Sequence, residues 1–177
     1  MKKIKAVIAI ILLVLMVNPS TAYAAEGELL AVIPSSITER VLSEEELEVL
    51  PLEMLQMEMI EDNQINATSG SYVAHEYSQT FDFYLDGDWA AAAHASCIVY
   101  RYTDGKVHLA SRTIWIERMT TFDAFKTYGS IVNTDGSVSY TTGDRVTIYN
   151  FTNIWTYAID FAATPTGQSF TCYEITY

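Results

Sequence analysis

The stretch after Ser71 alternates apolar and polar residues, and this alternation restricts the possible folds more than any other feature of the 177-residue chain. The clearest example is the run 76–85, in which the large apolar side chains share one parity: Tyr77, Phe81, Phe83 and Leu85. Every second side chain of a strand points to the same face of a sheet, so the pattern predicts strands with one buried and one solvated face. We therefore expect residues 67–177 to form a β domain.

Aspartate–glycine pairs separate the alternating runs. They stand at Asp86-Gly87, Asp104-Gly105 and Asp135-Gly136 and are typical of tight hairpin turns. Such short turns join antiparallel strands, because parallel strands need long crossover connections. We expect an all-β, antiparallel, jelly-roll-like β-sandwich of about seven strands, with an open β-barrel as the alternative.

Three segments of this β domain depart from simple alternation. The apolar residues change from odd to even positions between Leu109 and Ile114, which predicts a β-bulge. Residues 120–128 fit a short helical turn. Residues 145–161 fit one long strand with an aromatic face that is interrupted only by Asn153. Its aromatic members at 149, 151, 155, 157 and 161 share one parity.

The first 24 residues have the pattern of a secretory signal peptide. Three lysines precede an apolar run at 6–17, and Ala22-Tyr23-Ala24 supplies the small residues that signal peptidase requires. The apolar run is shorter than the roughly 20 residues of a membrane-spanning helix. We expect cleavage between Ala24 and Ala25 and release of a secreted, extracellular bacterial protein with no integral membrane span.

Residues 25–66 form a separate acidic segment. From 26 to 66 the chain holds 11 acidic residues and only one basic residue, Arg40. Ser43 and Glu46 have the spacing of a helix capping box, and Leu47 and Leu50 follow at helical spacing. Because the aromatic residues lie almost entirely after Asn66, we expect the segment to be dispensable for folding. It would serve as a propeptide, as a spacer, or as a helix docked on the β domain.

Charge and cysteine content limit the partners and the compartment. The formal net charge is −12, which excludes a nucleic-acid partner because such partners require a basic surface. The chain has two cysteines, Cys97 and Cys172, and an even count in an exported protein predicts a disulfide between them.

No catalytic, metal or cofactor motif is recognisable. His75, His94 and His108 each fall on an expected strand without a neighbouring nucleophile motif, so we assign them structural or surface roles. The acidic pair at Asp86 and Asp88 is explained by its turn, because calcium needs six to eight oxygen ligands. We expect no catalytic residue, no metal and no cofactor.

The aromatic content favours a binding role. The best candidate ligand-binding residues are Trp155 and Tyr157, on the aromatic face of the long expected strand. The first hypothesis is an exported, non-enzymatic binding or interaction module for an extracellular protein or carbohydrate. One alternative is a secreted toxin or antimicrobial effector masked by its N-terminal segment. Another is a hydrolase that would gather His94 or His108 with distant carboxylates.

The signal peptide gives a direct prediction. N-terminal sequencing of the protein recovered from the medium should begin at Ala25, because the small-residue motif ends at Ala24. A membrane-retained product that still begins at Met1 would contradict it.

Overall fold

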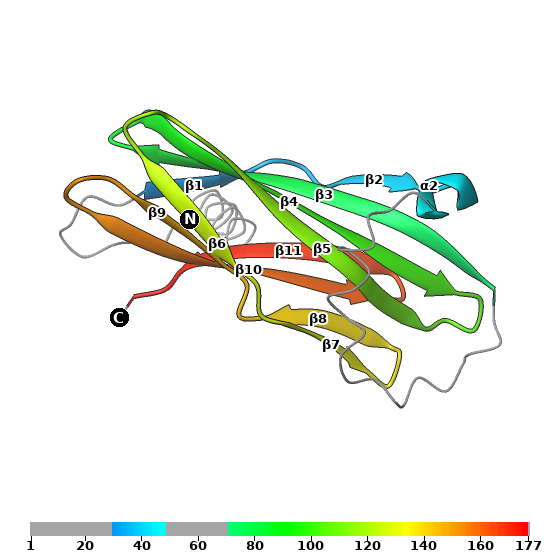
Figure 1. Cartoon of the computed structure of the whole chain (residues 1–177). Coiled ribbons are helices and arrows are strands. Elements are labelled where there is room, and N and C mark those ends of the chain that lie inside the picture. Colours follow the sequence, from blue (N-terminus) through cyan, green and yellow to red (C-terminus); the bar gives the residue numbers. More distant parts are fainter. Residues whose placement is uncertain (1–29, 49–70, 177) are drawn as a thin grey trace, which may run out of the picture.

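The protein is a sandwich of two antiparallel sheets, which Figure 1 shows as two layers of arrows. The computed structural model describes residues 30–48 and 71–176. The signal peptide and its cleavage site lie outside these residues, as do most of the Leu/Met positions of the acidic segment. The sandwich confirms the all-β, antiparallel fold expected from the alternation.

Sheet A holds the N-terminal strands in the order β1–β3–β4–β5, with β2 also paired to β3. The bounds are β1 Leu30–Pro34, β2 Thr38–Val41, β3 Tyr72–Leu85, β4 Asp88–Tyr102 and β5 Val107–Arg118. β1 pairs with the second half of β3 and β2 with its first half, so together they form one interrupted edge strand.

Sheet B holds the C-terminal strands in the order β6–β9–β10–β8–β7, with β11 on the other side of β10. The bounds are β6 Asp123–Thr127, β7 Ser130–Thr134, β8 Val138–Thr142, β9 Arg145–Tyr149, β10 Ile154–Thr164 and β11 Gly167–Glu174. β8 and β9 pair with successive parts of β10, and β7 and β6 extend them outwards. The described residues therefore contain more strand segments than expected, because several long strands are interrupted.

The turns and the bulge form where the sequence predicted them. Asp86 and Gly87 join β3 to β4 with φ angles of 52° and 90°, the left-handed conformation of a two-residue hairpin turn. The β4–β5 register skips Ala110, because Ile98 pairs with Ser111 and Val99 with Leu109. This extra residue is the predicted bulge.

Two local predictions were wrong. The expected long strand over 145–161 is a hairpin of β9 and β10, and the expected helical turn over 120–128 contains β6. The hairpin forms because the Asn150 side-chain oxygen accepts hydrogen bonds from the backbone N–H of Thr152 at 3.0 Å and of Asn153 at 2.8 Å. Such a side-chain turn reverses the chain without glycine or proline.

The acidic segment is partly built into the sandwich. Leu30 is buried in the main core, and Leu42 packs with Ala74, Ile98 and Ala110 on the outer face of sheet A. A chain cut at Asn66 would lose these contacts and leave one edge of β3 unpaired. These contacts oppose the expectation that the segment is dispensable for folding, which stays a prediction.

The short helix α2, Glu44–Glu48, follows β2 and confirms the capping box. Glu46 accepts a hydrogen bond from the Ser43 backbone N–H at 2.9 Å, and the Ser43 hydroxyl oxygen accepts one from the Glu46 backbone N–H at 3.3 Å. The Ser43 N–H bond, together with Arg40 and the Ser43 hydroxyl, lowers the pKa of Glu46 to about 2.

Both cysteines are free thiols, so the expected disulfide is not present in the structure. Cys97 is buried on β4 opposite Tyr77, and Cys172 lies on β11 opposite Ile159, so each belongs to a different sheet. An even cysteine count indicates nothing about distance, and a bridge requires a specific separation and orientation. Burial raises the pKa of both thiols, to about 12 for Cys172, which suppresses their reactivity at neutral pH.

A buried ion pair joins the two sheets. Arg112 of β5 donates to both carboxylate oxygens of Asp144 at 2.8 Å, and both side chains are almost completely buried. Asp144 also accepts from the Gly129 backbone N–H at 2.7 Å, while Arg112 donates to the Gly129 carbonyl. The pair thereby ties sheet A to the two interruptions of sheet B, between β6 and β7 and between β8 and β9.

Gly129 is required at this junction. A methyl group on its Cα would lie 1.6 Å from the backbone oxygen of Thr142, so a larger residue would push the two strands apart.

This ion pair predicts a large effect of substitution. Asp144→Ala should lower the free energy of unfolding by roughly 3–5 kcal/mol, because it leaves the Arg112 guanidinium buried without its counterion. Asp123→Ala, which removes an exposed ion pair with Arg118, should cost about 0–1 kcal/mol. Urea unfolding monitored by fluorescence measures both values. Equal costs for the two variants would contradict the assigned role.

Candidate ligand-binding surfaces

Trp155 and Tyr157, the residues favoured from the sequence, are core residues. Their side chains are only 4% and 1% exposed. Trp155 packs against Phe122, and Tyr157 packs against Phe83 and donates a hydrogen bond to the Leu30 carbonyl. The parity argument was correct in placing them on one face, but that face is turned towards sheet A. Neither residue is a surface anchor.

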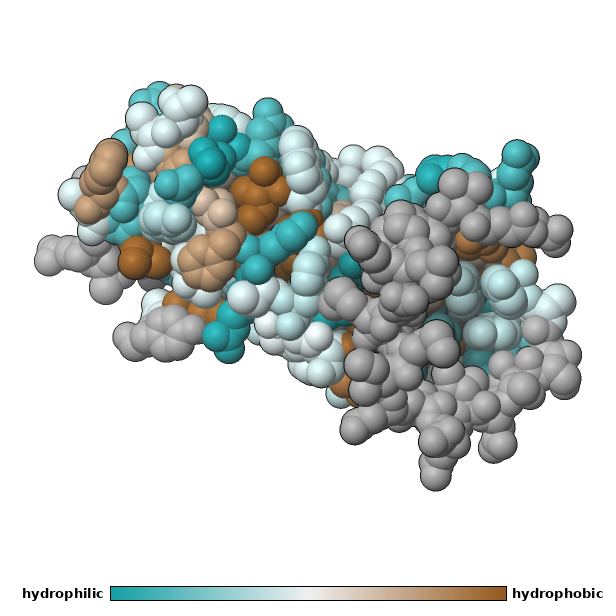
Figure 2. Space-filling model, viewed as in Figure 1, coloured by the Kyte–Doolittle hydropathy of each residue, from teal (hydrophilic) through white to brown (hydrophobic). Residues whose placement is uncertain are grey.

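Tyr173 of β11 is one exposed aromatic residue of sheet B, and others gather around the β9–β10 hairpin. Phe151, at the hairpin tip, is fully exposed, and Ile154 is 73% exposed. Phe125 lies on the neighbouring β6 and contacts Tyr149, with ring centroids 6.3 Å apart. We call Phe125, Tyr149, Phe151 and Ile154 the hairpin patch. Hydrophobic side chains interspersed with polar ones are visible on the left-hand part of the surface in Figure 2.

The hairpin patch is held by rigid local structure. The Asn150 side chain fixes the turn that carries Phe151, and Ile154 and Tyr149 form a cross-strand pair at the base of the hairpin. The sequence signal for this site was the Asn150-Phe151-Thr152-Asn153 run, in which asparagines flank an aromatic residue. It was missed because the surrounding aromatic parity suggested an uninterrupted strand.

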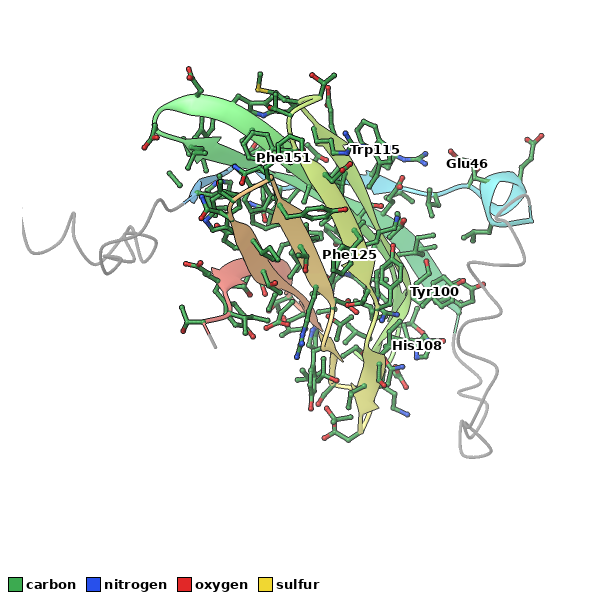
Figure 3. All side chains as sticks on the ribbon, turned by 60° about the vertical axis from the view of Figure 1, so that its left-hand side comes forward. Glu46, Tyr100, His108, Trp115, Phe125 and Phe151 are labelled. Atoms are coloured by element: carbon green, nitrogen blue, oxygen red, sulfur yellow. The ribbon has the colours of Figure 1, made fainter. Side chains whose placement is uncertain are left out.

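A second exposed aromatic residue, Trp115, lies on the outer face of sheet A. Its side chain is 56% exposed and contacts the His94 ring of β4, with ring centroids 4.6 Å apart and the ring planes tilted by 33°. His94 in turn hydrogen-bonds through Nδ1 to the Thr80 hydroxyl of β3 at 3.0 Å. Figure 3 shows Trp115 on the same side of the molecule as Glu46, Tyr100 and His108. Ile114, which is buried, and Ile116, which is partly buried, lie on either side of Trp115 and gave the alternation that predicts its outward position.

His75 lies in a different polar network. Its Nδ1 is 2.8 Å from Glu39 Oε1, and the same carboxylate oxygen accepts a hydrogen bond from the Tyr77 hydroxyl at 2.8 Å. Arg101 donates to the Tyr77 oxygen and to the carbonyls of Thr164 and Gly167 in the β10–β11 turn. The Tyr77 hydrogen bond lowers the pKa of Glu39. This network connects β2 to sheet B.

Two histidines therefore meet carboxylates, since His94 Nε2 also lies 3.5 Å from Glu117 Oε2. His94 and Thr80 sit within paired strands, whose backbone N–H groups serve the sheet ladder. The contacts of His94 with Thr80 and with Trp115 position the Trp115 ring. His108 stacks on Tyr100, with ring centroids 6.2 Å apart.

Within residues 30–48 and 71–176, no three histidine, cysteine or acidic side chains gather as metal ligands. In the same part of the chain, no helix has the length and hydrophobicity needed to cross a membrane. Comparison of the sequence with models of protein families and with curated proteins, and of the fold with solved structures, gives no match.

The different positions of the aromatic residues predict different effects on stability. Trp155→Ala should cost roughly 3–5 kcal/mol of unfolding free energy, because it creates a cavity in the core. Phe151→Ala should change the unfolding free energy by less than about 0.5 kcal/mol, because its ring packs on little of the fold. Chemical denaturation of both variants measures the difference. A strongly destabilised Phe151 variant would show that the hairpin tip is part of the core.

Proposed function

We propose that the chain is an exported, non-enzymatic binding module that holds an extracellular protein partner through the hairpin patch. The observation that carries the proposal is the full exposure of Phe151 at the tip of a hairpin whose conformation Asn150 fixes. The N-terminal signal pattern supports export.

The energetics of the hairpin patch favour protein recognition. Burying a Phe or Ile side chain that was exposed contributes about 1.5–3 kcal/mol, so Phe151 and Ile154 are suited to act as anchors. Their fixed turn reduces the entropy lost on binding. Clusters of exposed apolar side chains on a folded domain are typical of interaction surfaces.

The charge of the chain favours a basic partner. A net charge of −12 opposes association with a second copy and with anionic surfaces, and it speeds encounter with a positively charged protein. The same charge disfavours the alternative of an effector that acts on anionic bacterial membranes. The backbone N–H groups around His94 serve the sheet ladder, which favours binding over hydrolysis.

Capture of extracellular proteins by the tagged mature chain tests the proposal. Phe151→Ser combined with Ile154→Ser should weaken the complex at least about tenfold, which corresponds to about 1.4 kcal/mol. The matched control is Val41→Ser combined with Val73→Ser, which removes two exposed apolar side chains from β2 and β3. Dissociation constants are then measured with the purified partner.

A discrete partner lost only with the hairpin variant supports the proposal. Equal binding by both double variants, or a concentration-dependent dimer of the chain that the hairpin variant abolishes, would contradict it.

A further inference from the structure

A complete row of hydroxyl side chains crosses the outer face of sheet A. The backbone register pairs Thr38 of β2 with Ser78, Ser78 with Ser96, and Ser96 with Thr113 of β5. Ser78, Ser96 and Thr113 alternate with inward-facing neighbours, and the Thr38 hydroxyl bonds to that of Ser78, so the row lies on the same outer face as Trp115. Neighbouring members are separated by the strand spacing of about 4.8 Å.

The adjacent row on this face contains Thr80, His94 and Trp115. It lies two residues along each strand from the hydroxyl row, a distance of about 6.6 Å. The chain of contacts from Thr80 through His94 orients the exposed indole before any ligand arrives. An aromatic ring held in this way binds at a low entropic cost. The two rows together form what we call the sheet A platform.

Charged groups border the sheet A platform at both ends. Arg40 bonds to Glu76 and Glu46 at one end. At the other end Arg118 pairs with Asp123, the Asp82 carboxylate accepts from the Trp89 ring N–H at 3.0 Å, and Glu117 approaches His94. The hydroxyl row itself carries no charged side chain, and the carboxylates at its border outnumber the guanidinium groups. An uncharged ligand suits the row, because these carboxylates do not repel it and it needs no counterion on the row itself.

The hydroxyl row offers both donors and acceptors. Each hydroxyl has one donor and two acceptor positions. Thr38 and Ser78 use part of theirs in a bond of 2.6 Å to each other, and Thr113 uses part of its own in a side-chain hydrogen bond with Tyr128. A ligand that fits must bring many small groups that also donate and accept, beside an apolar face that stacks on an indole. A chain of sugar rings has both properties, because its ring C–H groups form apolar faces and its hydroxyls surround them.

We propose that the sheet A platform is a binding site for a neutral polysaccharide, with Trp115 as the stacking residue and the row of Thr38, Ser78, Ser96 and Thr113 as its hydrogen-bonding track. This site is separate from the hairpin patch, so it does not depend on the protein partner proposed above. An acidic polysaccharide or a nucleic acid is disfavoured by the net charge of −12.

Affinity electrophoresis of the mature protein tests this site. Native gels contain hydroxyethylcellulose, galactomannan or amylopectin as neutral probes, and polygalacturonate as an acidic one. The protein should be retarded by at least one neutral probe and not by polygalacturonate. Trp115→Thr, which keeps a strand-favouring residue, should weaken binding at least about tenfold. The control Tyr173→Ala removes a similarly exposed aromatic side chain from β11 of sheet B, outside both proposed sites, and should bind like the unmodified protein.

A second variant and a second measurement keep the test decisive if Trp115→Thr fails to fold. Ser96→Val removes one hydroxyl from the track and should weaken retardation by the same probe. Acrylamide quenching of tryptophan fluorescence should fall when the bound polysaccharide covers Trp115, the most exposed of the three tryptophans, since Trp155 is buried and Trp89 is half-buried. Absence of retardation in all neutral gels, retardation by polygalacturonate alone, or unchanged binding and quenching would overturn the site while leaving the protein-binding proposal intact.

Discussion

The sandwich depends on the buried pair of Arg112 and Asp144. Burying two charges is costly, and the cost is offset here because the pair is bidentate and its remaining hydrogen-bonding groups meet the backbone of Gly129. The contact joins β5 to sheet B where both outer strand pairs are interrupted. It therefore sets how sheet B bends against sheet A, and it defines which faces of the two sheets remain outside.

The edge next to this pair is closed by side chains rather than by a continuous ladder. The Lys126 ammonium and the Tyr128 hydroxyl donate to the Ile114 carbonyl, and the Tyr128 oxygen accepts from the Ile114 N–H at 2.9 Å. These bonds satisfy part of the free edge of β5, which would otherwise be open to strand addition. Trp115 follows directly in the chain, so the same contacts hold the strand that presents it on the outer face.

Local sequence patterns predicted much of the fold. The alternation at 76–85, the turn at Asp86-Gly87 and the bulge near Ala110 all follow from backbone geometry within a few residues. The sequence did not predict the β9–β10 hairpin, because the alternating aromatic residues fit one longer strand equally well. The turn that interrupts this strand is made by hydrogen bonds of the Asn150 side chain. The prediction of a disulfide was wrong because the distance between Cys97 and Cys172 depends on how the two sheets pack.

For the candidate sites, too, the sequence determined some features and the tertiary structure decided others. Periodicity in the sequence determined that the chain forms antiparallel strands with one apolar face, and the capping box at Ser43 determined where a helix begins. Only the tertiary structure decided that Trp155 is buried and that Trp115 and Phe151 are exposed. It also decided that Thr38 forms one row of hydroxyls with Ser78, Ser96 and Thr113, which are distant from it in the sequence. Alternation along a strand indicates which side chains share a face of the sheet. The other sheet, packed against one of these faces, determines which face is buried.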